Sequence, residues 1–475
     1  MNQLFWLRSD LRVADNTALA AAMNAGPTIA LYLITPAQWL AHDDAACKID
    51  FRLRNLRSLS ARLAALNVPL LVRCVADWQA VPAQIIGICH EHHVDGVHIN
   101  EEYGVNEQRR DDATAKALQR NGKTLHRHLD QLLFAPGSVK TLAGECFKVF
   151  SQFRKVCYAR LSHSLPHCLP VPAAQAPMCI ASDPVPTTVD GFAPPGDALQ
   201  AYWPAGEDAA LTRLGAFAQQ ALADYQLRRD FPAEPGTSQI SPYLAAGVVS
   251  PRQCLNAALA ENQGELDSGN PGAVTWINEL LWREFYKHIL VSYPRVSMGR
   301  AFRTETDALP WRHAPDELIA WQQGRTGFPI IDAAMRQLLS TGWMHNRLRM
   351  VTAMFLSKNL LIDWREGERW FMQHLIDGDL AANNGGWQWS ASTGTDSVPY
   401  FRLFNPLSQS TRFDPDGRFL RHWLPELAHL NGREIHNPAE QNGLFDPIDY
   451  PPPIVDLPMS RTRALTAFRQ LGETL

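Results

Sequence analysis

The sequence predicts an α/β domain built on a doubly wound parallel sheet, followed by a mainly α-helical domain. In residues 1–135, short apolar runs alternate with amphipathic stretches, which is the pattern of strands joined by helices. Beyond about Leu211 the apolar residues recur at helical spacing. The chain has 475 residues, 46% hydrophobic and 19% charged, so it is globular and long enough for more than one domain.

Five short apolar runs are the expected strands. They are LFWL at Leu4, TIALYLI at Thr28, VPLLVRC at Val68, GVHIN at Gly96 and TLHRHL at Thr124. Residues 51–67 place apolar side chains three and four positions apart, which predicts an amphipathic helix between two of the strands. Strands that alternate with helices form a parallel sheet. No GxGxxG follows the first strand, so the ordinary dinucleotide-binding fingerprint is absent and the sheet alone identifies no ligand.

A proline-rich stretch separates the two patterns. Nine prolines lie from Pro166 to Pro204, with Ala, Ser and Asp between them. This composition does not sustain a helix and is typical of a long extended connector. We therefore expect three parts: an α/β domain over residues 1–135, an interdomain linker over 136–206 and a helical domain over 207–475.

Three later segments have a clear helical pattern, and they begin at Trp276, Phe328 and Trp343. The stretch GDLAANNGGWQWSASTGTD, residues 378–396, is different, because it has little hydrophobic periodicity although it contains two Trp and two adjacent Asn. We expect no regular core element there. Its aromatic and hydrogen-bonding side chains therefore require another explanation.

The formal charge of −4 excludes a wholly basic nucleic-acid binder. Six basic residues lie among aromatic residues of the helical domain, which fits phosphate contacts and fits a solvated surface equally well. They are Arg228, Arg229, Arg347, Lys358, Arg402 and Arg412. The eight Cys form no CxxC pair, which indicates reduced thiols. Arg8 and Asp10 interrupt the apolar start, and no apolar run has the length of a bilayer span, so we expect a cytoplasmic protein.

Two helical faces are candidate binding surfaces. One face of the Trp276 helix aligns Glu279, Trp282, Arg283 and Tyr286, either as an ion pair beside core aromatics or as part of a pocket. The Trp343 helix aligns Asn346, Arg349, Met350 and Ala353, with Arg347 turned aside. Such a stripe is compatible with packing around a buried hydrogen bond and with a ligand pocket.

Three further motifs are ambiguous. GTSQIS from Gly236 offers N–H groups and hydroxyls to a phosphate, but it lacks the Lys of a P-loop and is as consistent with a helix N-cap. Asp377 and Asp379 lack the rest of a calcium-binding loop. The run CHEHH at Cys89–His93 lacks a second ligand cluster at zinc-site spacing. No metal site is expected.

Considered together, five segments are much more specific. LFWLRSDLRVADNTALAAA, GTSQISPYLAAGVVSPRQC, WINELLWREFYKHI, GFPIIDAAMRQLLSTGWMHNRLRM and DWREGERWFMQHLIDGDLAANNGGWQWSASTGTD resemble the photolyase and cryptochrome family over nearly the whole chain. The resemblance is strongest to microbial photolyases that act on cyclobutane pyrimidine dimers. It implies an N-terminal domain for an antenna chromophore and a helical domain that holds FAD in a U-shaped conformation. The implied activity is repair of DNA by an electron from photoexcited reduced FAD.

The resemblance also implies roles for individual residues. The FAD-binding set is Tyr225, Thr237, Ser238, Gln239, Ile240, Ser241, Arg283, Trp343, Asn346, Arg349, Asp377, Asp379 and Asn383. The catalytic set at the flipped lesion is Glu279, Trp282, Asn346, Met350, Asn383 and Trp389. The electron-transfer chain is Trp311, Trp364 and Trp387. The DNA-binding set is Arg229, Glu279, Arg347, Trp389 and Arg402, and the antenna set is His42, Asn106 and Glu107.

This resemblance explains the 378–396 stretch, because its glycines would allow close approach to a planar cofactor while Trp387 and Trp389 face different partners. Three rival members of the family differ at identifiable positions. Signalling cryptochromes commonly carry Asp or Cys where this chain has Asn383. Photolyases for six-four photoproducts resemble WxHH, with a second His where Asn346 stands. The single-strand-directed branch tends to lack the second lesion-facing Trp, which is Trp389 here.

The expected antenna is methenyltetrahydrofolate rather than deazaflavin. VNE at Val105–Glu107, with His42, resembles the folate-binding branch, although Met298 stands where that branch often has Lys. The expected partners are double- and single-stranded DNA that contains pyrimidine dimers. We expect a monomer with no obligate protein partner and no membrane attachment.

Overall fold

The computed structural model describes residues 1–441 and 449–473, and its chain divides into two compact units. The first unit comprises Met1–Ala223, Ser238–Pro294 and Ile376–Asp379. The second unit comprises Asp224–Thr237, Arg295–Leu375 and Leu380–Leu475. Each unit is described separately.

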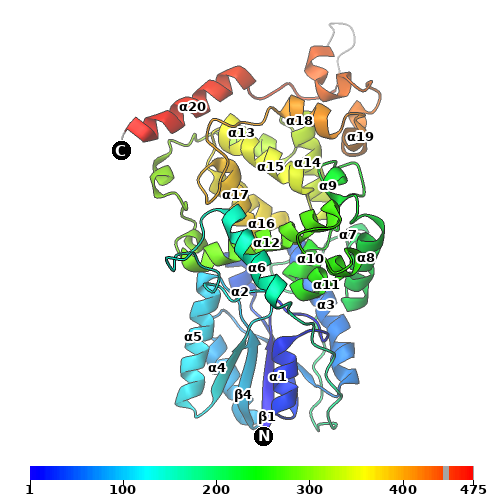
Figure 1. The fold of residues 1–475 in the computed structure, drawn as a ribbon, viewed down its shortest axis with the longest axis vertical. Coiled ribbons are helices and arrows are strands. Elements are labelled where there is room, and N and C mark those ends of the chain that lie inside the picture. Colours follow the sequence, from blue (N-terminus) through cyan, green and yellow to red (C-terminus); the bar gives the residue numbers. More distant parts are fainter. Residues whose placement is uncertain (442–448, 474–475) are drawn as a thin grey trace. The chain divides into compact units, whose positions relative to one another are not determined.

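A five-stranded parallel sheet is the centre of the first unit (Figure 1). Its strands are β1 (Asn2–Leu7), β2 (Thr28–Ile34), β3 (Leu70–Cys74), β4 (Val94–Asn100) and β5 (Thr124–His128), in the order β3-β2-β1-β4-β5. From β1 the chain adds β2 and then β3 on one side of β1, and it then adds β4 and β5 on the other side. Right-handed crossovers in these two opposite directions place helices on both faces of the sheet. The predicted doubly wound parallel sheet is confirmed.

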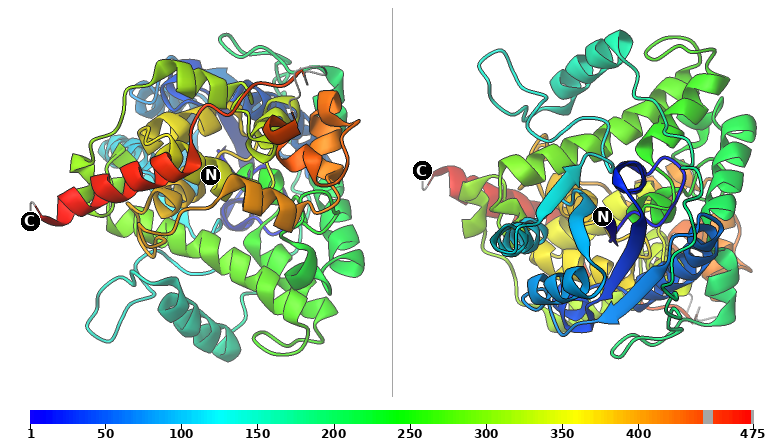
Figure 2. Two further views of the ribbon diagram at one scale, coloured as in Figure 1. Left: turned by 90° about the horizontal axis from the view of Figure 1, so that it is seen from above. Right: turned by 90° about the horizontal axis from the view of Figure 1, so that it is seen from below.

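Five helices connect and flank these strands. The strands and the helices appear in dark blue to cyan in the right-hand view of Figure 2. They are α1 (Thr17–Ala25), α2 (Pro36–Ala41), α3 (Ala46–Ala65), α4 (Val81–Glu91) and α5 (Val105–Arg120). The amphipathic helix predicted over residues 51–67 is the greater part of α3, which buries Leu56, Leu59 and Leu63. The first unit also contains α6 (Phe150–His163), α7 (Asp197–Tyr202), α8 (Glu207–Gln220), α10 (Ser241–Ala245), α11 (Pro251–Glu261) and α12 (Pro271–Ser292).

Residues 164–196 cross the edge of the sheet in an extended path. The side-chain amide of Gln175 donates to the main-chain oxygens of Thr28 and Asn67, both at 2.9 Å. Further along, the main-chain N–H of Asp183 donates to Leu70 at 2.8 Å, and its carboxylate accepts from Val72 at 2.8 Å. The proline-rich segment therefore satisfies polar groups of the β3 edge that would otherwise be open to pairing with another chain.

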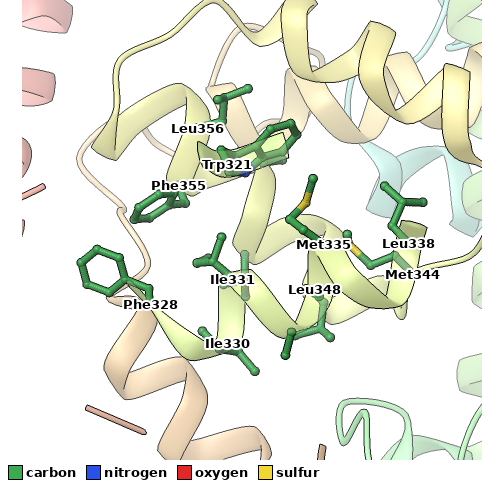
Figure 3. Close-up of a cluster of buried hydrophobic side chains, with 14 of the residues drawn as sticks. Trp321, Phe328, Ile330, Ile331, Met335, Leu338, Met344, Leu348, Phe355 and Leu356 are labelled. Carbon is green, nitrogen blue, oxygen red and sulfur yellow. The ribbon is translucent and has the colours of Figure 1, made fainter. Parts of the chain in front are cut away.

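The second unit is helical, and its helices surround a large apolar core (Figure 3). They are α9 (Tyr225–Arg228), α13 (Pro315–Gln322), α14 (Pro329–Thr341), α15 (Asn346–Met354), α16 (Trp364–His374), α17 (Leu380–Ala391), α18 (Pro406–Phe413), α19 (Arg418–Trp423) and α20 (Leu457–Glu473). A π-helical turn, Phe355–Asn359 (η3), follows α15. The core contains Trp321, Ile331, Met335 and Leu348 (Figure 3). The helices predicted from Trp276, Phe328 and Trp343 correspond to α12, α14 and α15.

The expectation that residues 378–396 build no regular core element is wrong. Residues 380–391 form α17, and the side chain of Trp387 is only 2% exposed. The helix lacks an apolar stripe because several of its buried side chains are amides, among them Asn383, Asn384 and Gln388. Buried amides that are hydrogen-bonded within the protein need no apolar periodicity.

A buried charge network joins the loop after β1, the residues after β5 and helix α11. Asp130 accepts from the guanidinium of Arg12 at 2.6 Å and from that of Arg252 at 2.8 Å. Arg252 also pairs with Asp15 at 2.9 Å. Burial alone would raise the pKa of Asp130, but the two guanidinium groups outweigh it and lower the pKa. Within the described residues of the first unit, the network thus holds α11 against the sheet domain.

No helix among residues 1–441 and 449–473 combines the length and the apolar character that crossing a bilayer requires. All eight cysteines lie in these ranges as free thiols.

Replacing Asp130 by Asn should destabilise the protein by about 3–5 kcal/mol, because the buried guanidinium of Arg12 loses its carboxylate partner and that of Arg252 keeps only Asp15. Because folding lowers this pKa, the contribution is fully present above about pH 4, the usual carboxyl pKa, and is lost as the pH falls below it. Urea unfolding at several pH values measures both effects. The control is Asp112→Asn, which removes the exposed pair of Asp112 with Arg127 and should change stability by less than about 1 kcal/mol. Equal losses in both variants would contradict the assignment.

Candidate functional site

The close packing of α16 against α17 positions the most buried tryptophan of the 378–396 stretch. A methyl group at Gly367 would overlap the indole ring of Trp387 and would lie 2.6 Å from Cδ2 of Leu356. Glycine is therefore required on α16. The indole ring of Trp387 packs edge-on against Phe371, with ring centroids 5.0 Å apart, and against Trp321 at 6.0 Å.

Amide side chains hold the polar face of α17. The amide nitrogens of Asn383 and Asn384 donate to the main-chain oxygen and the carboxylate of Glu368 on α16, both at 3.0 Å. Gln388 donates to the side-chain oxygen of Asn384 at 2.7 Å. Among the described residues, none donates a hydrogen bond to the side-chain oxygen of Asn383. Because the amide group of Asn carries no charge, this oxygen is a neutral acceptor in a largely buried setting.

The three tryptophans of the predicted electron-transfer chain all lie in the second unit. Trp364 and Trp387 belong to its main core, and Trp311, which is partly buried, packs against that core. The indole N–H groups of Trp311 and Trp387 have no acceptor among the described residues. The structure therefore brings these three rings into one apolar cluster. Trp389, the other tryptophan of α17, is only half-buried.

Helix α15 carries four of the predicted site residues. Its N-terminus is capped by the buried side chain of His345, which accepts from the main-chain N–H of Arg347 at 3.2 Å. Desolvation lowers the pKa of His345 to about 4, so this cap is neutral at pH 7. Asn346 is exposed, and Arg349 and Met350 are half-buried. The guanidinium of Arg349 donates to the main-chain oxygen of Met344 at 2.8 Å.

The predicted phosphate-binding arginines of the second unit have protein partners. Arg347 pairs with Asp230 at 2.6 Å, and its guanidinium lies 4.6 Å from the ring centre of Phe413. The guanidinium of Arg229 lies 5.1 Å from the ring centre of Tyr225, which is buried. Sequence reasoning missed Asp230, although an acid that directly follows Arg228 and Arg229 is a visible signal.

In the first unit, side-chain contacts fix the segment Ile376–Asp379. The hydroxyl of Ser241 donates to Asp377 at 2.6 Å, and the ammonium of Lys287 pairs with Asp379 at 2.5 Å. The structure thus brings together three predicted FAD-binding residues from α10 and from this segment. Lys287 was missed, although it lies four residues after Arg283 on the same face of α12.

The predicted lesion-facing stripe on α12 is half-buried at Glu279, Trp282 and Arg283, between fully buried neighbours. One face of Trp282 is covered by Phe150 of α6, with ring centroids 3.7 Å apart and planes 12° from parallel. The guanidinium of Arg283 donates to the main-chain oxygen of Gln131 at 2.5 Å. Sequence reasoning also missed Phe150, because nothing local to α6 indicates a stacking partner more than one hundred residues away.

The GTSQIS segment is divided between the units, with Thr237 in the second and Ser238, Gln239 and Ile240 in the first. Gln239 adopts a left-handed backbone conformation with φ 48°. Its side-chain oxygen accepts from Arg213 at 2.8 Å, and its amide nitrogen donates to the hydroxyl of Tyr202 at 3.2 Å. A role of Gln239 at a cofactor would therefore use its main chain.

Two of the predicted antenna residues are in contact. Nε2 of His42 lies 3.1 Å from the amide nitrogen of Asn106, and the imidazole ring meets Trp78 edge-on at 4.9 Å. Glu107, in the first turn of α5, folds back against Gly104, and burial raises its pKa. Met298, which departs from the folate-type pattern, is 55% exposed in the second unit.

Comparison with known proteins shows which family this chain resembles. Residues 3–173 match the model for DNA photolyase, and residues 276–470 match the model for the FAD binding domain of DNA photolyase. The chain is 47% identical to the deoxyribodipyrimidine photo-lyase of Salmonella typhimurium and 45% identical to that of Escherichia coli, in each case over 98% of both chains.

Solved structures agree with the sequence relatives. A class III photolyase from Agrobacterium tumefaciens matches with a TM-score of 0.88 at 33% identity, over 99% of this chain and 98% of that chain. A cryptochrome from Synechocystis matches with a TM-score of 0.86 at 29% identity, over 98% of this chain and 99% of that chain. The chain described here therefore belongs to the DNA photolyase family.

Proposed function

We propose that this chain is a light-dependent DNA-repair enzyme that splits cyclobutane pyrimidine dimers by electron transfer from photoexcited reduced FAD. The observation that carries the proposal is the 47% identity, over 98% of both chains, to an enzyme named deoxyribodipyrimidine photo-lyase. The reaction class is that of a carbon–carbon lyase. The match of residues 276–470 to an FAD-binding domain supports the cofactor.

The residues of the second unit fit a flavin. The side-chain oxygen of Asn383 is a neutral acceptor that is not used by a described residue, and Trp387 belongs to an apolar core. When bound, FAD supplies the electron that splits the dimer and receives it back. The residues that would hold it are Tyr225, Thr237, Ser238, Gln239, Ile240, Ser241, Arg283, Trp343, Asn346, Arg349, Asp377, Asp379 and Asn383.

The proposed lesion contacts use groups with complementary chemistry. The carboxylate of Glu279 accepts a hydrogen bond from a pyrimidine edge, and the rings of Trp282 and Trp389 offer faces to the flipped bases. Phe150 fixes the orientation of Trp282 by stacking on its other face. Asn346 and Met350 complete the set. Flipping costs a few kcal/mol and less at a damaged, poorly stacked pair, so selection of the lesion requires no reading of base sequence.

Arg229, Arg347 and Arg402 are proposed to contact the phosphate backbone of damaged DNA, whether duplex or single-stranded. Arg347 must exchange the carboxylate of Asp230 for a phosphate, which keeps its charge balanced in both states. Such contacts release counterions, so the log of affinity falls with the log of salt concentration by about 0.9 per phosphate on duplex DNA. We further propose that the protein is cytoplasmic and acts as a monomer.

The second chromophore is proposed to be methenyltetrahydrofolate, bound near His42, Asn106 and Glu107. The contact between His42 and Asn106 supports a common site. This proposal assigns residues 1–135 to the antenna, 136–206 to the linker and 207–475 to catalysis. An archaeal photolyase from Sulfolobus tokodaii contains two FAD molecules, so the identity of the second chromophore is a separate question from its presence.

Glu279→Ala tests the repair function most directly. One charge-assisted hydrogen bond in a dry pocket is worth about 1.5–3 kcal/mol, so repair per photon or lesion affinity should fall by roughly one to two decades. FAD content and photoreduction should stay unchanged, and Glu279→Gln should lie between. The matched control is Glu261→Ala, an exposed carboxylate on α11. Undiminished dimer splitting in a folded, FAD-loaded Glu279→Ala variant would remove Glu279 from the catalytic set.

Trp311→Phe separates photoreduction from repair. Phenylalanine is harder to oxidise than tryptophan, so light-driven reduction of oxidised FAD should slow sharply, while chemically reduced enzyme should still repair DNA. Transient absorption and a repair assay on the same preparation measure the two activities. Trp423→Phe is the control, because Trp423 also packs partly buried against the main core. Parallel loss of both activities in Trp311→Phe would reject the electron-transfer role.

Glu107→Ala should remove the near-ultraviolet absorbance of the antenna and leave FAD in place. The carboxylate lies in the first turn of α5, and Asp112→Ala on the same helix is an exposed control. The absorption spectrum of protein reconstituted with methenyltetrahydrofolate provides the measurement. If the folate remains bound to Glu107→Ala with unchanged affinity, the antenna site lies elsewhere.

A further inference from the structure

Lys358 is a buried cation without a buried counter-charge. It lies in the π-helical turn η3, and its side chain is 0% exposed. Its ammonium donates to the main-chain oxygen of Arg402 at 2.9 Å, and no carboxylate among the described residues pairs with it. An unpaired buried charge is expensive, so a lysine in this setting loses its proton more easily than a lysine in water. Desolvation, and then the charge of Arg402, lower the pKa of Lys358 to about 7.

The acceptor of this hydrogen bond lies in a segment without helix or strand, residues 394–405. Phe401 and Arg402 are among the exposed residues of the segment, and Phe401 is 58% exposed. The start of the segment is fastened at Val398, whose main-chain N–H donates to Trp389 at 3.3 Å and whose oxygen accepts from Ser392 at 2.7 Å. At Arg402 the hydrogen bond from Lys358 joins the main chain of the segment to the helical core.

We propose that Lys358 is a positioning residue for DNA binding. It fixes the main chain of Arg402, so that the guanidinium group and the ring of Phe401 are presented to the nucleic-acid backbone. The inference rests on the proposed function, because contact of Arg402 with phosphate is part of that proposal. A phosphate beside Arg402 offsets the repulsion between Arg402 and Lys358 and strengthens the charged form of the lysine. DNA binding and protonation of Lys358 therefore favour each other.

The other charged side chains near η3 do not provide the coupling between DNA binding and protonation that is assigned to Lys358. Of the helices that pack on η3, α17 has no ionisable side chain, and α20 brings Arg463, which donates to the main-chain oxygen of Asn359 at 2.6 Å. The charged residues of α15 and α16 contact other groups. Arg347 pairs with Asp230, Arg349 bonds Met344, Arg365 pairs with Asp307 and Asp363, Arg369 pairs with Glu366, and Glu368 accepts from Asn384.

The sign of the pH effect follows from the direction of the coupling. Free protein holds the Lys358 proton less tightly than the DNA complex does, so binding takes up protons around neutral pH. Affinity for damaged DNA should increase as the pH falls from 8.5 to 6, and the increase should end once Lys358 is charged in the free protein too.

The test compares Lys358→Met with Asn359→Ala in the FAD-loaded, full-length protein. Met matches the length and buried setting of the lysine without its charge. Asn359 is the next residue of the same turn and bonds the hydroxyl of Ser460 on α20 at 3.0 Å, so its removal perturbs the turn without releasing Arg402. The probe is an oligonucleotide with one cyclobutane dimer, and affinity is measured against salt and against pH.

Lys358→Met should keep its FAD and bind the oligonucleotide roughly ten-fold more weakly. The slope of log affinity against log salt concentration should become shallower by about one, as expected for one lost phosphate contact. It should also lose the affinity gain between pH 8.5 and 6. Asn359→Ala should keep the wild-type slope and pH profile even if its melting temperature falls. Trypsin should cut after Arg402 faster in Lys358→Met than in Asn359→Ala.

If the affinity of the wild-type protein for the oligonucleotide does not change between pH 8.5 and 6, the inference is overturned. This measurement needs no variant, so it decides the question even if Lys358→Met folds poorly. A Lys358→Met variant with wild-type slope and pH profile would overturn it as well. If the wild-type protein repairs the oligonucleotide in both cases, the proposed function stands. If the wild-type protein neither binds nor repairs it, the proposed function fails and the inference fails with it.

Discussion

The packing of α16 against α17 is the constraint on which the second unit depends. Gly367 allows the indole of Trp387 to lie directly against α16, and Glu368 receives the amides of Asn383 and Asn384. An apolar contact and a polar contact therefore fix one helix from two sides. This arrangement turns Trp387 into the core and leaves Trp389 half-buried, so the two tryptophans of the stretch face different surroundings. It also leaves the side-chain oxygen of Asn383 without a hydrogen-bond donor among the described residues.

Charge is managed differently in the two units. In the first unit, carboxylates of the segment Ile376–Asp379 are matched by Ser241 and Lys287. In the second unit, α17 carries no charge, and buried groups such as His345 are held neutral by desolvation. Fixed dipoles can orient a reactive group without reorganising around it.

Much of this architecture was predictable from local pattern. All five strands were located from the sequence. β1 and β2 are almost entirely buried and show continuous apolar residues, whereas β5 is largely exposed and contains two His and one Arg. Helix α17 was missed because its buried face is built of amides, which a hydropathy pattern does not distinguish from a loop. The stacking of Phe150 on Trp282 and the pair of Arg347 with Asp230 join residues more than one hundred positions apart, so the spacing of residues along the chain does not identify which residues pair. Family motifs named the site residues; they did not name these partners.

Light drives this protein to split pyrimidine dimers. The most direct measurement incubates the FAD-loaded, chemically reduced protein with an oligonucleotide that contains one cyclobutane dimer, in blue light and in darkness. Chromatography then quantifies intact pyrimidines. Pyrimidines should be restored in the light and not in the dark, with many turnovers per protein and no consumption of the reduced cofactor, because the electron returns to it. Dimers that persist under illumination while the reduced flavin remains bound would contradict the account.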